Sequence, residues 1–423
     1  MLETRVQREH KIVQSIQSLL RNRSDIVIRR TDKSKVFYIG NATDFAGKAE
    51  EYMLKTNACQ EVQNSRSQKA VTFQQYKKIS PNTNKLELGH YHGLPKPHKP
   101  GTPLRLIIAS IHAPATLVSK FLNDLLAPIY LNVAREVTFI NGIDVIRKLE
   151  KHVLDGHFQA TTNFIVIDVT DLYRMIPREG ALHALMRLLK KHSDHGKIGT
   201  LSIDAIMRMA RLVLDTNCFA YDNKYYKQTR GGAMGFTFTQ ALANIYMHEW
   251  EQDLIQHQVV HNGIYGRYID DIFMTTNQNR DAIKIQFEKV AKKNINIKIN
   301  FEIDTSVNFF DVTINNEDGC LKTYLYHKTT AEPYILPYTS DHPRHVHRNI
   351  PYAALLRAAR ICSDVYDFNR ERIRIDISLL LNNYPPNFIR KQFDRFFQVN
   401  NAMPVLDESN SQVYHRLHQQ LLH

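Results

Sequence analysis

The sequence predicts an α+β fold of antiparallel strands and amphipathic helices, and three observations support this prediction. The first is residues 164–167, a continuous apolar run typical of a strand that is buried on both faces. The second is residues 264–274, which read as two short apolar strands that turn at the adjacent carboxylates Asp270 and Asp271. The third is a set of segments with helical spacing of apolar residues, namely 178–192, 203–214 and 281–293.

The N-terminal part of the chain predicts a hairpin and a proline-rich loop. Residues 1–60 look helical at first, and then the apolar runs 25–28 and 36–39 flank a basic loop at 29–35 that is rich in turn residues. Residues 94–103 contain four prolines. They cannot form a helix, because proline lacks the backbone N–H of an interior helical position.

Strands and helices alternate in the rest of the chain. Residues 104–110 read as a strand, and a hairpin that turns at Asp222-Asn223 precedes a glycine-rich loop and a helix at 242–250. The apolar face of the helix at 281–293 consists of Ile283, Phe287 and Val290. From Cys320 onward the pattern is helical and basic.

Composition indicates the class of partner. The chain has 423 residues, and its 55 Lys and Arg against 42 acidic residues give a net charge of +13. A basic surplus is often only a solvated surface, but 20 Tyr and 20 Phe add possible stacking platforms, which favours nucleic acid. The four cysteines are far apart, which argues against a disulfide framework and indicates a reducing compartment. No secretory segment or apolar run of spanning length occurs, so no membrane association is expected.

Three aspartates suggest a catalytic site. Asp168 ends the buried strand, where a carboxylate is costly unless it is paired or bound to a metal. An alternative is that Asp168 or Asp171 caps the helix after Pro177. Beside a hairpin that ends in Asp270 and Asp271, Asp168 would help to hold two metal ions, which activate a hydroxyl and stabilise a leaving pyrophosphate. The expected reaction is nucleotidyl transfer.

These segments resemble motifs of reverse transcriptases, and the chain as a whole resembles the polymerase of Penelope-like retroelements, relatives of telomerase reverse transcriptase. The matching segments are 92–105 (fingers signature), 168–177 (motif A), 231–235 with 242–247 (motif B), 268–271 (motif C), and 308–314 with 326–330 (post-catalytic blocks). The resemblance runs from about residue 25 to beyond residue 386.

The resemblance implies a right-hand polymerase with an antiparallel-sheet palm, fingers and a helical thumb. It divides the chain into an N-terminal extension with a basic hairpin, fingers and palm, a thumb, and a C-terminal tail, at 1–80, 81–318, 319–400 and 401–423. The implied cofactor is a pair of Mg²⁺ ions, with Mn²⁺ as a substitute. Asp168 and Asp270 are expected to ligate both ions, Asp271 to bind more weakly, and the Val169 carbonyl to add a backbone ligand.

Nucleotide-binding roles follow from the same resemblance. Arg105 corresponds to the fingers arginine that clamps the triphosphate, since a guanidinium binds phosphate through paired donors. A surface role is its alternative, and either Lys96 or Lys99 is its partner. The ring of Tyr173 is expected to exclude the ribose 2′-OH, and a core aromatic is the alternative. Residues with backbone contacts to the nucleotide are Asp171, Leu172, Gly232 and Gly235.

Nucleic-acid contacts are expected at Lys33, Lys35, Lys328 and His342, and for Lys33 and Lys35 a solvated loop is the alternative. The group His342, His345 and His347 also suggests zinc, but its surroundings resemble the family's thumb block, which binds primer–template. The chain departs from the family where residues 236–240 replace the usual Ser-Pro pair and where Leu106 replaces a proline. These departures affect template handling rather than chemistry.

The leading hypothesis is an RNA-directed DNA polymerase of a Penelope-like mobile element that uses an RNA template, a DNA primer and dNTPs. It would be intracellular, and nuclear where it acts on chromosomal DNA. A domesticated or telomerase-like cellular reverse transcriptase and an inactive nucleic-acid-binding relative are the alternatives. The GIY-YIG endonuclease that many relatives carry after the thumb is not in this sequence, so the chain belongs to a branch that lacks it or is a fragment.

Overall fold

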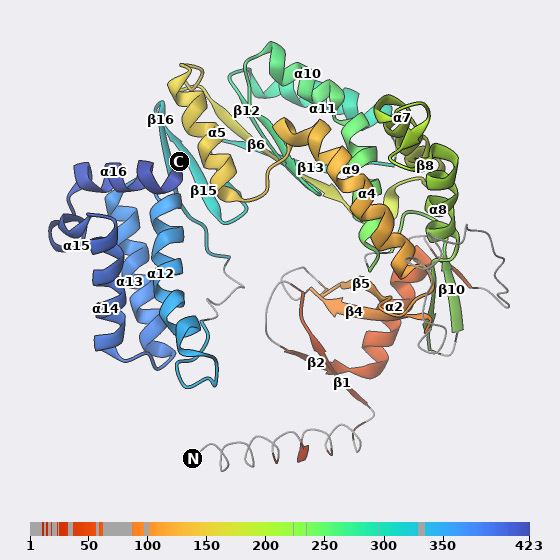
Figure 1. The fold of residues 1–423 in the computed structure, drawn as a ribbon, viewed down its shortest axis with the longest axis horizontal. Helices are drawn as coiled ribbons and strands as arrows, with labels where there is room; N and C mark the ends of the chain where they lie inside the picture. The colour runs from red at the N-terminus through yellow and green to blue at the C-terminus, as the bar shows by residue number, and fades with distance from the viewer. Residues whose placement is uncertain are drawn as a thin grey trace. The chain divides into compact units, whose positions relative to one another are not determined.

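The computed structural model describes residues 11, 14–15, 18, 23, 25–32, 37–55, 59–61, 87–96, 101–222, 224–233, 235–294, 296–328 and 335–423 (Figure 1). It is a mixed α/β structure in which the chain forms two compact units. One unit combines Met1–Tyr130 with Tyr173–Tyr246, and the other combines Leu131–Leu172 with Met247–His423. Within the described ranges, no helix is both long and apolar enough to span a bilayer.

The first unit contains a five-stranded sheet with the strand order β3-β10-β9-β4-β5. Its strands are β3 (Cys59–Glu61), β4 (Gly89–Pro95), β5 (Leu104–Ala109), β9 (Cys218–Tyr221) and β10 (Lys224–Gln228). The pairing of β4 with β9 is parallel, and the other pairings are antiparallel. A separate antiparallel hairpin of β1 (Ile26–Arg30) and β2 (Phe37–Asn41) contacts the sheet through β4, and α2 (Ala42–Lys55) packs on β1 and β5.

Helices make up most of the remaining first unit. They are α4 (Thr116–Ala134), α6 (Leu172–Met175), α7 (Arg178–His192), α8 (Ile203–Asp215) and α9 (Thr237–Trp250), and the ends of α4, α6 and α9 extend into residues of the second unit. The small hairpin of β7 (Lys197–Ile198) and β8 (Leu201–Ser202) joins α7 to α8, which pack on each other. The Ser202 hydroxyl caps α8 by accepting from the Ala205 N–H, which explains where this helix begins.

The second unit is built around a four-stranded antiparallel sheet with the order β11-β12-β6-β13. Its strands are β6 (Asn163–Thr170), β11 (Tyr265–Tyr268), β12 (Asp271–Thr276) and β13 (Lys298–Asp304). Phe164, Ile165 and Ile167 of β6 are fully buried, as expected of an internal strand. Helix α10 (Gln252–Val260) contacts β11, and α11 (Arg280–Lys293) contacts β13.

The rest of this unit is a three-stranded meander and a helical bundle. The meander consists of β14 (Ser306–Phe309), β15 (Val312–Glu317) and β16 (Cys320–Leu325). The bundle consists of α12 (Arg344–Ile361), α13 (Val365–Leu381), α14 (Pro386–Val399), α15 (Met403–Glu408) and α16 (Ser411–Leu422). In Figure 1, α12, α13 and α14 run side by side, and their shared core includes the fully buried Leu355, Phe368 and Phe396.

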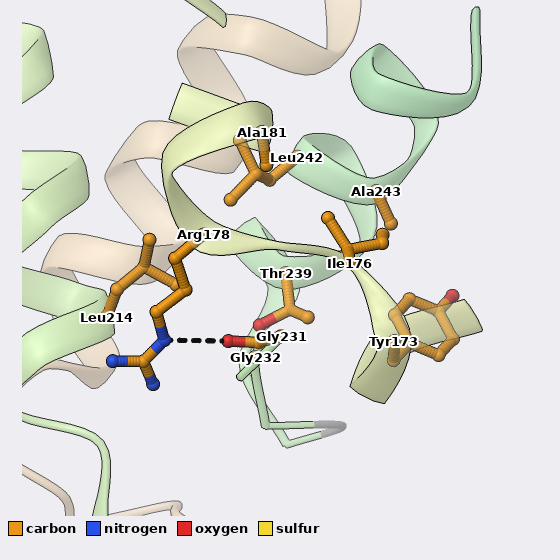
Figure 2. Close-up of a pocket in the computed structure, with 10 residues that line it drawn as sticks. All are labelled: Tyr173, Ile176, Arg178, Ala181, Leu214, Gly231, Gly232, Thr239, Leu242 and Ala243. Carbon is orange, nitrogen blue, oxygen red and sulfur yellow. Dashed lines mark hydrogen bonds between the residues drawn. The ribbon is translucent and has the colours of Figure 1, made fainter. Parts of the chain in front are cut away.

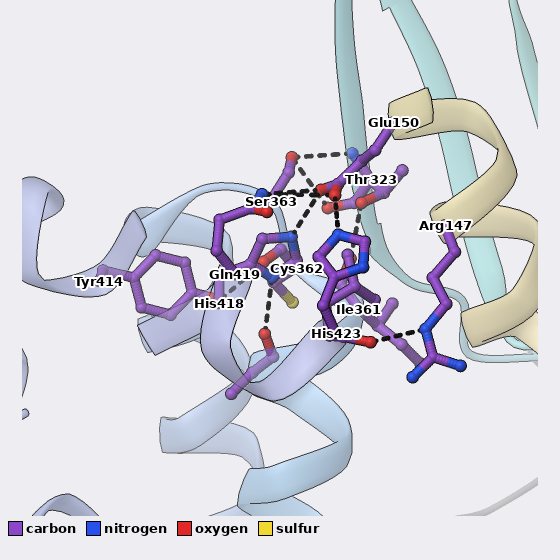
Figure 3. A network of polar contacts seen from close by, with 12 residues as sticks. Arg147, Glu150, Thr323, Ile361, Cys362, Ser363, Tyr414, His418, Gln419 and His423 are labelled. Carbon is purple, nitrogen blue, oxygen red and sulfur yellow. Dashed lines mark hydrogen bonds and ion pairs between the residues drawn. The ribbon is translucent and has the colours of Figure 1, made fainter. Parts of the chain in front are cut away.

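Helix α5 (Gly142–Leu154) joins the bundle to the meander. It contacts both α12 and β16. Figure 3 shows the polar part of this junction, in which the Glu150 carboxylate lies 3.1 Å from His418 Nε2 and 3.3 Å from His423 Nε2. The Gln419 side-chain amide also donates to Glu150, at 3.2 Å. One carboxylate on α5 therefore holds three side chains from the C-terminal end of the chain.

Most of the strands and helices predicted from the sequence are present. The hairpin at 264–274, the strand at 104–110 and the helices at 178–192, 203–214 and 281–293 are confirmed within one or two residues. Ile283, Phe287 and Val290 are all buried, so the predicted inner face of α11 is also confirmed.

The prediction of helix from Cys320 onward is wrong at its start, because Cys320–Leu325 is strand β16. Its pairing with β15 places Glu317 opposite Cys320, so Asp318 and Gly319 form a two-residue turn. Both turn residues have positive φ, at 50° and 89°. The Asp-Gly pair is a strong sequence signal for such a hairpin. The helical bundle begins at Arg344.

Candidate active site

The register of the four-stranded sheet brings the three predicted aspartates to one end of it. Strand β12 pairs with β6 so that Asp271 lies directly opposite Asp168. The Val169 N–H donates to the Asp270 carbonyl over 2.9 Å, which ties the tip of the hairpin to β6. Because opposed residues of an antiparallel pair project to the same face, Asp168 and Asp271 share one face of the sheet.

This placement is electrostatically unfavourable without a cation. Asp168 is exposed, and Asp270 and Asp271 are half-buried. Like charges directly opposite each other destabilise a sheet, whereas carboxylate oxygens suit a hard divalent cation such as Mg²⁺. The donor set therefore fits the ion. In the part of the chain that the structure describes, however, no three acidic, histidine or cysteine side chains converge closely enough to hold a metal.

Two further residues flank the aspartates, Asn300, which the sequence reasoning missed, and Tyr268, the first residue of the segment 268–271. Asn300 of β13 lies opposite Asp168 on its other side, and its amide donates to the Thr170 hydroxyl at 3.0 Å. Tyr268, which immediately precedes the turn, meets the ring of Phe310 edge-on with 5.0 Å between the centroids. No sequence motif indicates these contacts, because they depend on the register of β13 and on the turn between β14 and β15.

In the first unit, the predicted nucleotide-binding residue Tyr173 of α6 contacts the glycine-rich loop that contains Gly232 (Figure 2). The Gly232 N–H donates to the Tyr173 carbonyl at 3.0 Å, and the Gly231 N–H donates to the Ile176 carbonyl at 3.0 Å. Gly231 has a φ of 58°, and a Cβ there would overlap the Tyr173 carbonyl oxygen. Gly231 is therefore needed for the close approach of the two backbones, a role the sequence reasoning did not assign to it.

Arg178, the first residue of α7, also contacts the glycine-rich loop, and the sequence reasoning did not identify it. Its Nε donates to the Gly231 carbonyl at 3.1 Å, and its Nη2 donates to the Gln228 carbonyl. Tyr173, Gly231, Gly232 and Thr239 line a pocket of about 10 Å³. Such a volume holds about one water molecule, so this pocket is a packing gap and not a nucleotide site.

The predicted triphosphate clamp is partly described. Arg105 Nε lies 3.3 Å from Oδ2 of Asp32, whose side chain is only 6% exposed. In this structure the arginine thus forms an internal ion pair with the loop after β1. Lys96 follows β4, and its N–H closes the proline-rich loop by donating to the Pro103 carbonyl at 2.9 Å. Lys99 lies outside the described residues, as do Lys33 and Lys35.

Gly235 also permits a close backbone approach. A Cβ at this position would overlap the carbonyl oxygen of Ile108 at the end of β5. The glycine-rich loop before α9 is therefore packed against β5, the strand that carries Arg105. Asp171 is exposed and has a φ of 53°, and Leu172 is buried. Both lie in the second unit, directly after β6.

The remaining predicted contacts lie in the second unit. Lys328 and His342 are both exposed. His347 of the suggested zinc group is buried in the bundle, with Nε2 at 3.2 Å from the Ser340 carbonyl and Nδ1 at 3.4 Å from the Tyr384 hydroxyl. His342 Nδ1 lies 2.5 Å from the Ser340 hydroxyl. These imidazoles make polar contacts within the protein, and such contacts account for His347 without a metal.

Comparison with known proteins identifies a similar fold. The structure is similar to telomerase from Candida albicans in complex with a TWJ fragment of telomeric RNA, with a TM-score of 0.63 and 12% identity over 94% of this chain and 70% of that one. It is similar to apo telomerase from Candida tropicalis, with a TM-score of 0.55 and 11% identity over 93% and 72% of the two chains. It is also similar to apo telomerase from Candida tropicalis truncated from its C-terminal domain, with a TM-score of 0.51 and 12% identity. This match covers 71% of this chain and 64% of that one.

This chain thus spans less than two thirds of the truncated telomerase, and at such identities the similarity shows the fold alone. A sequence profile described as an animal helix-turn-helix domain matches residues 334–394. That segment contains α12, α13 and the first part of α14. No curated protein sequence matches the chain.

Proposed function

We propose that this protein is an RNA-directed DNA polymerase that extends a DNA primer on an RNA template. The observation that carries the proposal is the strand register that places Asp168 opposite Asp271, with Asp270 tied to β6 beside them. The fold that the chain shares with telomerase supports the same reading. Within this proposal the four-stranded sheet belongs to a palm, residues 81–318 form fingers and palm, and residues 319–400 form a thumb.

The proposed cofactor is a pair of Mg²⁺ ions, held by Asp168, Asp270, Asp271 and the Val169 carbonyl. When bound, such ions lower the barrier to attack by the primer hydroxyl and to departure of pyrophosphate. The protein's own contribution is to place Asp168 opposite Asp271, with Asp270 in the adjacent turn, so that negative charge is in place before substrate arrives. Arg105, with Lys96 or Lys99, is proposed to bind the triphosphate of the incoming dNTP.

The proposed biological setting is a Penelope-like mobile element acting on chromosomal DNA in the nucleus. It rests on the motif order in the sequence. A telomerase-like cellular enzyme with the same site remains the alternative within the same reaction class. Polymerase assays address the reaction, whereas the copy number and flanking repeats of the coding region separate these two settings.

Primer extension by an Asp270 variant tests the reaction. Asp270→Asn removes one carboxylate charge from the proposed ion pair and should lower the rate by at least ~10³-fold. Asp318→Asn is the matched control, because Asp318 is an exposed aspartate at the tip of the β15–β16 hairpin and asparagine tolerates its positive φ of 50°. The control should extend primers like the parent. Equal rates for Asp270→Asn and the parent would refute the assignment.

A second candidate function is nucleic-acid binding without polymerisation. It is favoured by the helix-turn-helix match and by a basic cleft between α12 and α14 with a volume of about 640 Å³. The basic residues that line it are Arg348, Arg390, Lys391 and Arg395. A parent protein that binds primer–template tightly but adds no nucleotide with Mg²⁺ or Mn²⁺ would select this candidate.

A further inference from the structure

The turn that carries Asp270 has a strained backbone. Ile269, between Tyr268 and Asp270, has a φ of 57°. A β-branched residue rarely adopts this left-handed conformation, since its side chain crowds the backbone there. Such a conformation persists only where surrounding contacts hold it, and strained residues of this kind gather at functional sites. The contacts that hold this turn are therefore of functional interest.

Arg267 supplies a direct contact to the turn. Its Nη1 donates to the Ile269 carbonyl at 2.9 Å, and its Nε donates to Oε2 of Glu251 at 2.6 Å. Nη2 reaches the other carboxylate oxygen of Glu251 at 3.4 Å. The planar guanidinium thus joins the strained turn to a carboxylate 16 residues earlier in the chain. A lysine has one ammonium group and cannot reproduce this forked geometry.

Glu251 is a fixed anchor for that arginine. It has no exposed surface and lies immediately before α10. It also accepts from the Tyr265 hydroxyl at 2.8 Å, and its Oε1 lies 3.2 Å from His248 Nδ1. Burial acts to raise the pKa of Glu251, but Arg267, His248 and Tyr265 outweigh it and the pKa is lowered. The anchor is therefore a buried carboxylate that stays ionised.

Arg267 lies on the opposite face of the sheet from Asp168 and Asp271. Arg267 is opposite Ile272, and Ile272 is opposite Ile167; both isoleucines are fully buried. Asp271 and Asp168 are displaced by one residue from this row and so project to the other face. Arg267 is only 3% exposed, and its contact to the Ile269 carbonyl reaches the turn that carries Asp270.

We infer that Arg267 and Glu251 are positioning residues that hold the strained turn at Ile269, and thereby set where Asp270 and Asp271 point. The inference rests on the proposed polymerase function for its catalytic consequence, but the mechanical part stands without it. Loss of the contact to the Ile269 carbonyl would let the turn relax toward an unstrained backbone. The carboxylates would then lose their fixed geometry while the rest of the sheet stayed folded.

Hydrogen exchange on the full chain tests the mechanical part. The variant Arg267→Lys keeps the positive charge that faces Glu251 but cannot also reach the turn. Backbone amides of residues 264–276 should therefore exchange at least about 10-fold faster than in the parent. Amides of residues 306–325 should exchange at the parental rate. Glu251→Gln keeps the shape of the anchor and should give a smaller effect in the same place. If Arg267→Lys does not fold, Glu251→Gln replaces it as the test variant. Glu150→Gln, at another polar cluster, should leave 264–276 unchanged.

A second experiment removes the backbone strain at Ile269 directly. Glycine adopts positive φ without cost, so Ile269→Gly in the Arg267→Lys background should restore part of the lost protection and of any lost rate. In primer extension, Arg267→Lys should lower the rate at saturating dNTP by about 10-fold or more, with primer–template affinity within about twofold of the parent. It should also raise the Mg²⁺ concentration needed for half-maximal rate. A purely structural role would instead lower stability and affinity together.

The outcomes separate the two claims. If the parent does not extend primers but Arg267→Lys loosens 264–276, the proposed function fails and the positioning role stands. If Arg267→Lys leaves exchange at 264–276 unchanged, or if Ile269→Gly restores nothing, the inference is overturned whether or not the parent is active.

Discussion

Tyr173 is the residue at which the choice of sugar can be tested. It is half-buried, and its carbonyl accepts the Gly232 N–H, so its backbone position does not depend on the ring. Tyr173→Val should therefore keep this contact while removing the bulk proposed to exclude a ribose 2′-OH. Ribonucleotide incorporation should rise by ~10-fold or more, with deoxynucleotide use falling only modestly. Single-nucleotide incorporation of dNTP and rNTP by the two proteins measures the ratio.

The contrary result at Tyr173 has its own physical meaning. If the ring serves only to pack against the loop at Gly231 and Thr239, its truncation leaves a cavity that costs up to about 3–5 kcal/mol and depresses all activity together. An unchanged dNTP/rNTP ratio would remove Tyr173 from the proposed nucleotide site and would mean that the protein does not select deoxynucleotides through this residue.

The three aspartates could be found from the sequence, and the residues that support them could not. Asp168 follows an apolar run and Asp270-Asp271 sits between two others, so the pattern of apolar residues indicated all three. The prediction that Asp168 ends its strand is wrong by two residues, because β6 continues to Thr170. Arg267 and Glu251 are neither adjacent nor helically spaced, and their contact depends on how α10 meets β11. The same holds for Arg178 and the carbonyls of Gln228 and Gly231, since backbone acceptors carry no residue-type signal.

At the scale of elements, helix α16 is attached to α5 mainly through one carboxylate (Figure 3). Glu150 faces His418, Gln419 and His423, and the Arg147 guanidinium donates to the Leu422 carbonyl at 2.6 Å. Burial acts to raise the pKa of Glu150, but its three partners outweigh burial and the pKa is lowered. Ionised Glu150 therefore stabilises the folded protein.

This attachment predicts a pH-dependent effect of Glu150→Ala. Near pH 7 the variant should lose about 1–3 kcal/mol of unfolding free energy, because the buried His418 of α16 is left without its carboxylate partner. Since the folded pKa of Glu150 lies below its ordinary value of 4.5, the ionic contribution is present above that value and is lost as the pH falls below it. Denaturant titrations of parent and variant should thus converge on acidification. A constant difference down to pH 4 would contradict the charge-based account.

The elements that the sequence predicted well are those with a strong local pattern. Helix α11 shows its buried face every three or four residues, and β6 contains the continuous apolar run 164–167. Strand β16 was mistaken for helix because its residues are mixed in polarity and the basic helices after it dominate the composition. The Asp318-Gly319 pair is the sequence feature that indicates a hairpin at this position.

At the scale of the whole molecule, sequence order and spatial order differ. The first compact unit joins Met1–Tyr130 to Tyr173–Tyr246, and the second takes up the segment between them. Composition along the chain does not show that each unit combines two separate segments, because no local sequence pattern links the two segments of a unit. The fold is nevertheless similar to that of telomerase at 12% identity, since the placement of apolar residues in strands and helices constrains a fold more than their identities do.

The net charge of +13 predicts how the whole molecule binds its substrate. If phosphate contacts dominate, each neutralised phosphate releases counterions, and the logarithm of affinity for primer–template should fall against the logarithm of salt concentration with a slope of about −4 or steeper. Replacing Arg390 and Lys391 of the basic cleft by Gln should make that slope less steep by about 1 for each phosphate contact that is lost. Fluorescence anisotropy over a salt series measures both slopes. A flat dependence in the parent would mean that the basic surplus is a solvated surface, and an unchanged slope in the variant would place the phosphate contacts outside the cleft between α12 and α14.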